Sequence, residues 1–356
     1  MNTQNDILIE IRGLKTYFFL DEGVVQAVDG VDLDIYRNKT LCVVGESGCG
    51  KSVTARSILQ IVDPPGRIVE GEIRYHRRVE QNGSVSTEVI DLAALHPRSR
   101  AIREIRGKDI SMIFQEPMTS LSPIHTIGDQ ITEAILLHTD MSKKEARERT
   151  IELLRRVGIP RPADRFNHYP FQLSGGMRQR VMIAMALSCN PSLLIADEPT
   201  TAVDVTTQAQ ILELLLELQE EFGMAIMLIT HDLGVVAEMA DDVAVMYLGR
   251  VVERGDVDSI FHDPQHPYTR ALLRSIPRLG FTLEGKRERL DSIRGMVPDP
   301  YNRPQGCVFH PRCDEMIPGL CDRLVPPRTL LDDGREVRCL LYEDVAQTYQ
   351  AEAKVS

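Results

Sequence analysis

The sequence contains no long uninterrupted apolar run. Crossing a bilayer takes roughly 18–20 consecutive apolar residues, and no segment of this 356-residue chain approaches that length. The first residues also lack the basic region followed by an apolar region that marks a signal peptide. These absences predict a protein that folds in the cytosol, so any role at a membrane would depend on docking to separate membrane subunits.

An excess of positive charge is also missing. The chain has 41 Lys and Arg against 52 Asp and Glu, a formal net charge of −11. A protein that binds nucleic acid broadly needs a basic surface, so nucleic acid is not an expected partner. Hydrophobic residues make up 43% and charged residues 26%, which is ordinary for a globular chain long enough for two domains.

Short apolar segments alternate with helical patterns over the first 255 residues. The expected strands are residues 7–12, 31–36, 40–44, 192–196 and 224–230. The expected helices are residues 52–62, 126–157, 173–190 and 206–222. Residues 72–90 alternate around Asn82-Gly83, which favours a β-hairpin. This order predicts an α/β fold with a parallel sheet, and the helical block at about 116–185 looks like an insertion into it.

The composition changes after about residue 255. Proline becomes frequent, long periodic segments become rare, and four of the seven cysteines crowd the end of the chain. We therefore expect one domain over residues 6–255 and a small C-terminal extension over residues 256–356.

A glycine-rich motif lies between an expected strand and an expected helix. It consists of Gly45, Glu46, Ser47, Gly48, Cys49, Gly50, Lys51 and Ser52, and it matches the phosphate-binding loop of nucleotide-binding proteins. The glycines let backbone N–H groups close around phosphates, and the helix N-terminus adds a favourable dipole. Lys51 is expected to reach the β- and γ-phosphates of ATP, and the Ser52 hydroxyl to bind Mg²⁺.

Two carboxylates end the apolar segment at 193–197. Asp197 suits a role in holding Mg²⁺ through its water shell. Glu198 is then placed to polarise the attacking water. An Asp-Glu pair at the end of a strand is common by itself, but behind a phosphate loop it predicts ATP hydrolysis.

A second glycine motif opens another expected helix. Leu173, Ser174, Gly175 and Gly176 place two glycines behind a serine, which forms a second anion site. One chain needs a second γ-phosphate site only if that site serves a partner. Here the sequence resembles the ABC ATPase family, whose LSGGQ motif closes over ATP held by the opposite subunit; Met177 replaces the usual glutamine.

The resemblance covers roughly residues 7–255. It implies a P-loop ABC-type nucleotide-binding domain with an antiparallel β subdomain and an inserted helical subdomain. Gln115 falls at the family's Q-loop, which senses Mg²⁺ and the membrane subunit. The implied Mg²⁺ contacts are therefore Ser52, Gln115 and Asp197.

Two more positions match motifs of the family. Asp204 fits the D-loop that links the two sites, and His231 fits the switch histidine that contacts the γ-phosphate. The implied catalytic residues are Glu198, His231 and Gln115. The implied contacts to the partner's ATP are Ser174, Gly175, Gly176 and Asp204. For the aromatic residue that stacks on adenine, Phe18 fits the spacing best, although Tyr17 and Phe19 are adjacent.

Two segments resemble the oligopeptide, dipeptide and nickel importers within that family. They are His266-Pro-Tyr-Thr269 and the Ile-Arg-Gly-x-Asp-Ile stretch at 105–110. The resemblance implies an ATPase subunit of a binding-protein-dependent importer, with short peptides as the expected solute. Nickel or a glycoside is an alternative solute. A soluble ABC ATPase outside transport, or an exporter subunit, is a rival hypothesis.

The C-terminal cysteines are Cys307, Cys313, Cys321 and Cys339. In a reducing cytosol such a cluster points to metal before disulfides, but the spacing is not the paired CxxC of common zinc sites. Four thiolates can hold zinc or an iron–sulfur cluster, and the resemblance implies [4Fe–4S]. Zinc, with His310 as a further ligand, and unligated thiols are the alternatives.

The same resemblance implies the partners and the location. The expected partners are a second ABC ATPase subunit, a paralogue in a heterodimer, two membrane permeases and, indirectly, an extracytoplasmic solute-binding protein. The expected location is the cytoplasmic face of the inner membrane, as a peripheral subunit.

Overall fold

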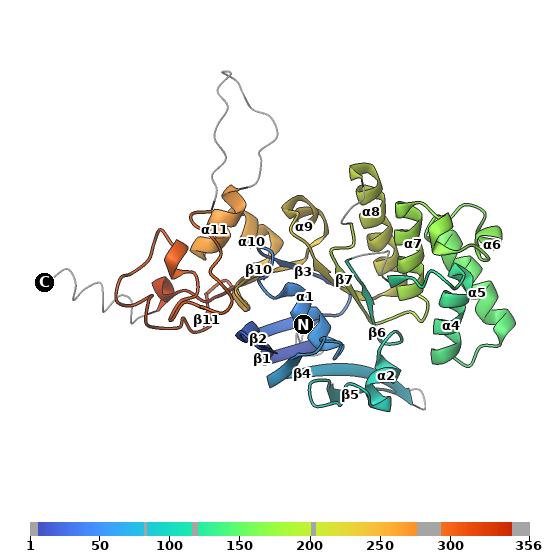
Figure 1. Cartoon of the computed structure of the whole chain (residues 1–356), viewed down its shortest axis with the longest axis horizontal. Coiled ribbons are helices and arrows are strands. Elements are labelled where there is room, and N and C mark those ends of the chain that lie inside the picture. The colour runs from blue at the N-terminus through green and yellow to red at the C-terminus, as the bar shows by residue number, and fades with distance from the viewer. Residues whose placement is uncertain (1–5, 82–83, 116–119, 201–203, 276–292, 344–356) are drawn as a thin grey trace, which may run out of the picture.

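A computed structural model of the chain describes residues 6–81, 84–115, 120–200, 204–275 and 293–343. Two sheets and the helices around them make up the molecule (Figure 1). The larger sheet supplies the functional residues, and the smaller one packs beside it.

The larger sheet has the strand order β11-β12-β10-β9-β3-β8-β7-β6 within the described residues. Its parallel part consists of β3 (Thr40–Val44), β6 (Ile110–Ile113), β7 (Leu193–Asp197), β8 (Ala225–Ile229) and β9 (Asp242–Tyr247). Every residue of β3, β7 and β8 is buried, as expected for parallel strands that are covered on both faces. This burial explains their unbroken apolar sequences. The carboxyl ends of these strands meet at one edge, where α/β sheets bind ligands.

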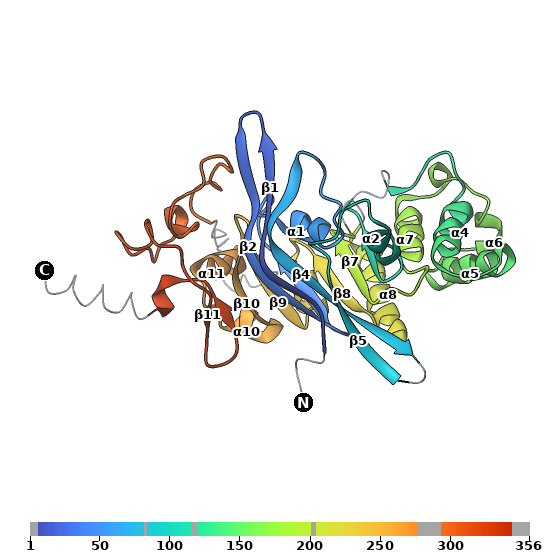
Figure 2. The same ribbon diagram turned by 90° about the horizontal axis from the view of Figure 1, so that it is seen from below.

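The smaller sheet is antiparallel, with the order β2-β1-β4-β5. It contains β1 (Ile7–Leu20), β2 (Gly23–Tyr36), β4 (Gly66–Gln81) and β5 (Ser84–Asp91), and Figure 2 shows β1 and β2 as a long ribbon. Gln81 pairs with Ser84, as the predicted hairpin requires, while Asn82 and Gly83 themselves lie outside the described residues.

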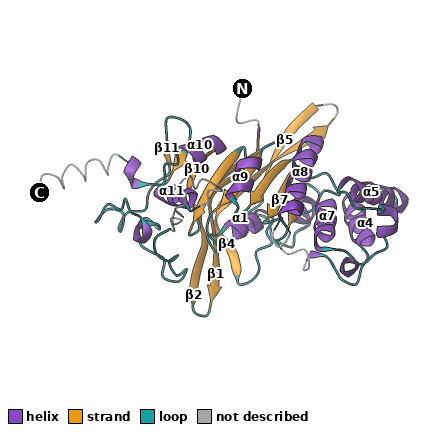
Figure 3. Cartoon of the chain, turned by 90° about the horizontal axis from the view of Figure 1, so that it is seen from above, coloured by secondary structure: helices purple, strands orange, loops and turns teal. Residues whose placement is uncertain are grey.

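A group of helices lies at one end of the molecule (Figure 3). It contains α4 (Ile127–His138), α5 (Lys143–Arg156), α6 (Pro162–Arg165) and α7 (Gly175–Ala186). The start of α5 is fixed by a capping box in which Ser142 and Glu145 each bond the other's backbone N–H. These helices confirm the helical pattern expected from residue 126 onward, and α7 contacts β6 of the larger sheet.

The remaining helices pack near the sheets. They are α1 (Lys51–Ile58), α2 (Arg100–Ile105), α8 (Val205–Phe222) and α9 (Leu233–Met239). α8 ends at Gly223, whose φ of 61° suits a residue without a side chain. Most of the expected strands and helices of the first 255 residues are confirmed to within a few residues. However, β1 and β2 each extend eight residues beyond the expected 7–12 and 31–36, and the helical pattern at 126–157 is two helices, α4 and α5.

The described residues after 256, namely 257–275 and 293–343, are called the C-terminal segment below. Its helices are α10 (Val257–His262) and α11 (Pro267–Arg274), and its strands are β11 (Thr329–Leu330) and β12 (Glu336–Val337). β12 pairs with β10 (Arg250–Asp256), which is antiparallel to β9. The C-terminal segment thus continues the larger sheet.

Among the helices in the described ranges, none has both the length and the apolar character needed to span a membrane.

Candidate functional site

The glycine-rich loop runs from the end of β3 into α1 and is packed closely against its neighbours. Gly45 has φ 147° and Gly50 has φ 101°, values that favour glycine. A Cβ on Gly45 would overlap the Met246 carbonyl oxygen, and one on Gly50 would overlap that of Ala27. The backbone at these two positions therefore has no room for another residue type, as the sequence motif predicts.

Lys51 lies inside the curve of this loop. Its side chain is buried, and its Nζ donates hydrogen bonds to the carbonyl oxygens of Gly45 at 2.7 Å and Glu46 at 3.1 Å. Lys51 is also the first residue of α1, so the positive end of the helix dipole adds to the ammonium charge. The loop combines backbone N–H groups, a cation and a helix N-terminus, which together suit a phosphate chain.

A pair of oxygen donors lies beside the loop. The Ser52 hydroxyl donates to Asp197 Oδ1 at 2.9 Å, joining the start of α1 to the end of β7. Burial raises the pKa of the Asp197 carboxyl, and the bond from Ser52 works in the opposite direction. Hydroxyl and carboxylate oxygens are the ligands that Mg²⁺ prefers, so these residues fit the ion that ATP carries.

Three polar residues converge just beyond Asp197. Glu198 accepts a hydrogen bond from Gln115 Nε2 at 3.0 Å, and its other carboxylate oxygen lies 3.4 Å from His231 Nδ1. They follow the neighbouring strands β7, β6 and β8. Glu198 has a φ of 47°, an uncommon value for a residue with a side chain and one found at functional sites. Its backbone N–H donates to the Ile229 carbonyl at 2.9 Å, which fixes this turn.

The second glycine motif, at residues 173–176, lies at the start of α7, whereas the phosphate loop leads into α1. Ser174 caps α7 by accepting from the Met177 N–H at 3.3 Å, and both Ser174 and Gly175 are exposed. Asp204 caps α8 in the same manner, accepting from the Thr207 N–H at 2.9 Å. Figures 1 and 2 place α7 toward the α4–α6 helices, apart from α1. The predicted residues thus form two sets, one around Lys51 and one at the starts of α7 and α8.

The three candidate aromatic residues end β1 in different surroundings. The Tyr17 hydroxyl donates to Asp29 at 2.9 Å, and burial with this bond raises its pKa to about 12. The Phe18 ring lies against Gly66, where a Cβ would be 2.6 Å from it. Phe19 is exposed and has the Arg67 guanidinium 4.4 Å from its ring centroid. All three lie at the same end of the β1–β2 hairpin.

The prediction of a metal centre at the C-terminal cysteines is wrong. Within the described residues, which include Cys307, Cys313, Cys321 and Cys339, no group of three or more His, Cys, Asp or Glu side chains could hold a metal ion. Cys307, Cys321 and Cys339 are buried and Cys313 is half-buried. This burial raises all four thiol pKa values, to about 12 for Cys313 and Cys339.

The physical reason is that a buried thiol behaves as a small apolar side chain. Metal ligation needs the thiolate, which an apolar environment disfavours. Cys307 and Cys321 are part of the main hydrophobic core, and Cys313 packs against it. Both the [4Fe–4S] cluster and the zinc alternative are therefore withdrawn, and with them the iron–sulfur assignment of these residues.

The sequence-based predictions missed two residues that contact the phosphate loop. The Tyr268 hydroxyl accepts from the Glu46 N–H at 3.0 Å, and Arg312 binds the Glu46 carboxylate at 2.6 Å and 3.1 Å. Tyr268 belongs to the His-Pro-Tyr-Thr segment, which resembles that of peptide and nickel importers but gave no indication of a contact with the phosphate loop. Nothing in the local pattern around Arg312 points to the loop.

Two family profiles match the chain. The profile described as "ABC transporter" matches residues 28–201, and that described as "Oligopeptide/dipeptide transporter, C-terminal region" matches residues 252–321. The oligopeptide transport ATP-binding protein AppD of Bacillus subtilis is 51% identical over 95% of this chain and 97% of its own length. The dipeptide transport ATP-binding protein DppD of Escherichia coli is 47% identical over 93% of this chain and 96% of its own.

A solved structure gives the same picture of the fold. The dimeric post-hydrolysis state of the ATP-binding cassette MJ0796, bound to ADP and Pi, has a TM-score of 0.59 and 27% identity. The match covers 70% of this chain and 99% of the chain in that structure. The similarity thus extends over the cassette.

Proposed function

This chain belongs to the ABC transporter family of ATP-binding subunits, and from that premise we propose that it is the ATP-hydrolysing subunit of an importer for di- or oligopeptides. One observation carries the proposal. Lys51, the Ser52–Asp197 pair and Glu198 meet at one edge of the larger sheet, in a chain whose relatives are named as peptide transport ATP-binding proteins.

The phosphate loop binds the triphosphate of ATP in this proposal. The N–H groups of residues 45–52 and the Lys51 ammonium bind the phosphate oxygens, and Phe18 stacks on the adenine. Ser52, Asp197 and Gln115 would hold Mg²⁺, which would neutralise charge that develops on the phosphates. The 2.9 Å contact between Ser52 and Asp197 supports this assignment.

Glu198 acts as the general base for the attacking water. A carboxylate serves this role when it is held in place and remains ionised. Gln115 and His231 contact its two oxygens from either neighbouring strand and orient it. In the same scheme His231 also contacts the γ-phosphate, so Glu198, His231 and Gln115 form the catalytic set.

Ser174, Gly175, Gly176 and Asp204 serve the ATP of a second ABC subunit. The exposure of Ser174 and Gly175, and the helix N-terminus behind them, support a site completed by a partner. The similarity to a cassette solved as a dimer supports the same arrangement. ATP then closes two subunits over two sites, and hydrolysis reopens them.

The rest of the assembly follows from the proposed function. Residues 6–255 form the ATPase domain, with the helical subdomain at about 116–185 facing the permeases, and residues 256–356 form the C-terminal extension. The partners are a paralogous ATPase subunit, two permeases and an extracytoplasmic binding protein. The chain would then work as a peripheral subunit on the cytoplasmic face of the inner membrane.

Uptake measurements test the proposed function directly. Cells without this chain should lose uptake of labelled dipeptides and oligopeptides, and the wild-type chain should restore it while Glu198→Gln should not. Nickel and a labelled glycoside are measured in the same cells. Loss of nickel or glycoside uptake with intact peptide uptake would assign another solute. If the uptake of peptides, nickel and the glycoside all stayed normal, the proposed role in their import would be refuted.

A further inference from the structure

Glu46 in the phosphate loop contacts the C-terminal segment. Two groups of that segment hold it. The Tyr268 hydroxyl accepts from the Glu46 N–H at 3.0 Å, and the Arg312 guanidinium donates to both Glu46 carboxylate oxygens, at 2.6 Å and 3.1 Å. The Glu46 carbonyl in turn accepts from Lys51 Nζ at 3.1 Å. The N–H, the side chain and the carbonyl of this one residue are therefore all engaged.

Arg312 is itself held rigidly. It is 5% exposed, and its Nε donates to the Arg294 carbonyl at 2.9 Å. Its guanidinium lies 5.8 Å from the centroid of the Tyr247 ring. Burial works against its charge, but hydrogen bonds to Glu46 and Tyr247 raise its pKa above the ordinary value. A bidentate hydrogen bond from a guanidinium that is itself held in place fixes both the position and the orientation of the Glu46 carboxylate.

An aromatic cluster supports both contacts. Tyr247 at the end of β9, Tyr268 on α11 and Phe309 pack on one another, with ring centroids 4.7–5.3 Å apart. Tyr247 and Tyr268 are almost fully buried. Because the cluster joins the larger sheet to the C-terminal segment, the loop, the sheet and the segment form one packed unit.

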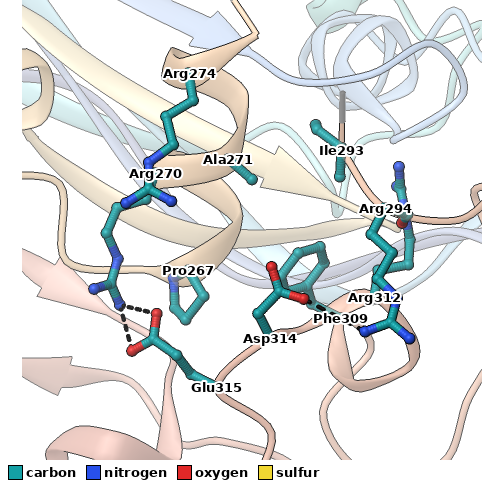
Figure 4. Close-up of a pocket in the computed structure, with 10 residues that line it drawn as sticks. All are labelled: Pro267, Arg270, Ala271, Arg274, Ile293, Arg294, Phe309, Arg312, Asp314 and Glu315. Atoms are coloured by element: carbon teal, nitrogen blue, oxygen red, sulfur yellow. Dashed lines mark hydrogen bonds and ion pairs between the residues drawn. The ribbon is translucent and has the colours of Figure 1, made fainter. Parts of the chain in front are cut away.

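The neighbouring arginines make other contacts. A cavity of about 150 Å³ lies beside α11. Figure 4 shows Arg270, Arg294 and Arg312 among the residues that line it. Arg270 pairs with Glu315 at 2.9 Å, and Arg294 lies 3.6 Å from Asp314. Arg312 reaches past this cavity to the phosphate loop.

We propose that Arg312, assisted by Tyr268, is a positioning residue for ATP binding, through which the C-terminal segment sets the shape and charge of the phosphate loop. A loop already held in its binding shape loses less conformational freedom when the ligand arrives. The second effect is electrostatic. Glu46 carries a negative charge within a loop that binds phosphates, and the guanidinium neutralises it and holds it to one side.

The inference rests on the proposed function, because it assumes that this loop binds ATP. The experiment measures the dissociation constant of ATP with Mg²⁺ by calorimetric titration of the full-length chain. Wild-type chain that bound no ATP would refute the proposed function. The comparison between variants tests the inference alone.

Arg312→Gln should weaken ATP binding by at least about tenfold, because loop order and charge neutralisation are lost together. Glu46→Gln alone should have a smaller effect. The double variant Arg312→Gln/Glu46→Gln should bind ATP more tightly than Arg312→Gln, since the unpaired negative charge is gone. If Arg312 had a purely structural role, the additional Glu46→Gln substitution would not restore ATP affinity.

Arg335→Gln is the matched control. Arg335 is also buried in the C-terminal segment, and it pairs with Asp263 and Asp333 at distances of 2.9 Å and 2.5 Å. Its loss should lower thermal stability while leaving ATP affinity near that of the wild type. Equal loss of affinity in Arg312→Gln and Arg335→Gln, or wild-type affinity in Arg312→Gln, would overturn the inference.

Two milder variants cover the case in which Arg312→Gln does not fold. Arg312→Lys keeps the charge but loses the two-pronged geometry, and Tyr268→Phe keeps the ring while removing the acceptor for the Glu46 N–H. Each should weaken ATP binding severalfold with little change in thermal stability. Unchanged affinity in both folded variants would also overturn the inference.

Discussion

The Ser52 hydroxyl lies 2.9 Å from an Asp197 carboxylate oxygen, although the two residues are 145 positions apart in the sequence. Asp197 ends a fully buried strand and is itself 2% exposed. A buried carboxylate needs a partner, and the hydroxyl at the start of α1 is that partner. The contact joins two motifs that the sequence supplies separately.

Removing the charge of Asp197 should weaken Mg²⁺ binding at the ATP site. Asp197→Asn keeps the size of the side chain but weakens its affinity for a hard cation. ATP hydrolysis should fall by at least about 100-fold, and the Mg²⁺ concentration for half-maximal binding of ATP should rise. Asp109→Asn is the control. Asp109 is half-buried, and burial raises its pKa as it does that of Asp197, but Asp109 lies before β6, whereas Asp197 ends β7. Equal effects of both changes would contradict the Mg²⁺ assignment.

Replacing Glu198 by glutamine should separate binding from hydrolysis. The amide keeps hydrogen-bonding capacity toward Gln115 and His231 but cannot accept a proton from water. Losing a positioned base typically lowers the rate by about 10²–10⁴-fold, while the affinity for ATP should stay near that of the wild type. Steady-state hydrolysis and equilibrium binding measure the two quantities. Near-normal turnover would exclude Glu198 as the base.

Gly175→Asp should act only when two subunits meet. A Cβ at Gly175 would have no atom within 4 Å apart from its chain neighbours and the nearby backbone of its own helix, so the substitution fits the isolated subunit. The added carboxylate would face the phosphates of the partner's ATP and repel them. Monomer ATP affinity should therefore be unchanged, while ATP-driven dimerisation, followed by light scattering, should be lost.

Lys51→Ala provides the contrast to that change. Lys51 lies inside the subunit's own phosphate loop, so its loss should weaken ATP binding to the monomer. If Gly175→Asp and Lys51→Ala lowered monomer affinity equally, the assignment of two separate sites would be refuted.

His266 should make the chain less stable at mildly acidic pH. The imidazole is buried, its Nδ1 accepts from the Tyr268 N–H at 3.0 Å, and burial together with Arg270 lowers its pKa to about 3. The unfolded chain binds a proton near pH 6.5 and the folded chain does not, so stability is full above pH 6.5 and decreases below it. At pH 5 the expected loss is about 2 kcal/mol.

His266→Asn tests this linkage, because asparagine keeps an acceptor at the start of α11 and does not titrate. The difference in unfolding free energy between pH 7.5 and pH 5 should be about 2 kcal/mol smaller in this variant than in the wild type. Identical pH dependence in the two proteins would show that His266 is not responsible.

The phosphate loop and the strands around it could be predicted because each depends on contiguous residues. Gly45 and Gly50 are required by local backbone shape, and β3, β7 and β8 are recognisable as unbroken apolar runs. The resemblance to the ABC ATPase family points to Gln115, Glu198 and His231. Expected strands precede Glu198 and His231, but no strand is expected before Gln115, which follows β6.

The contacts of Glu46 could not be predicted in this way. Tyr268 and Arg312 lie 222 and 266 residues further along the chain, and a single arginine in a proline-rich segment carries no local signal. The prediction of a metal centre at the C-terminal cysteines was wrong for a related reason. Their spacing permits a shared metal, but whether Cys307 and Cys321 become ligands or core residues depends on burial, which only tertiary packing decides.

The pairing of β12 with β10 bears on how the chain could be shortened. Glu253 and Arg254 pair with Val337 and Glu336, and the Arg338 N–H donates to the Val252 carbonyl at 2.8 Å. A chain cut after Asp256 would expose this edge of the larger sheet, with its free backbone groups beside apolar Val251 and Val252. Exposed edges of this kind recruit strands from other molecules, so a minimal ATPase made by such truncation should self-associate unless β10 is given a charged or proline substitution.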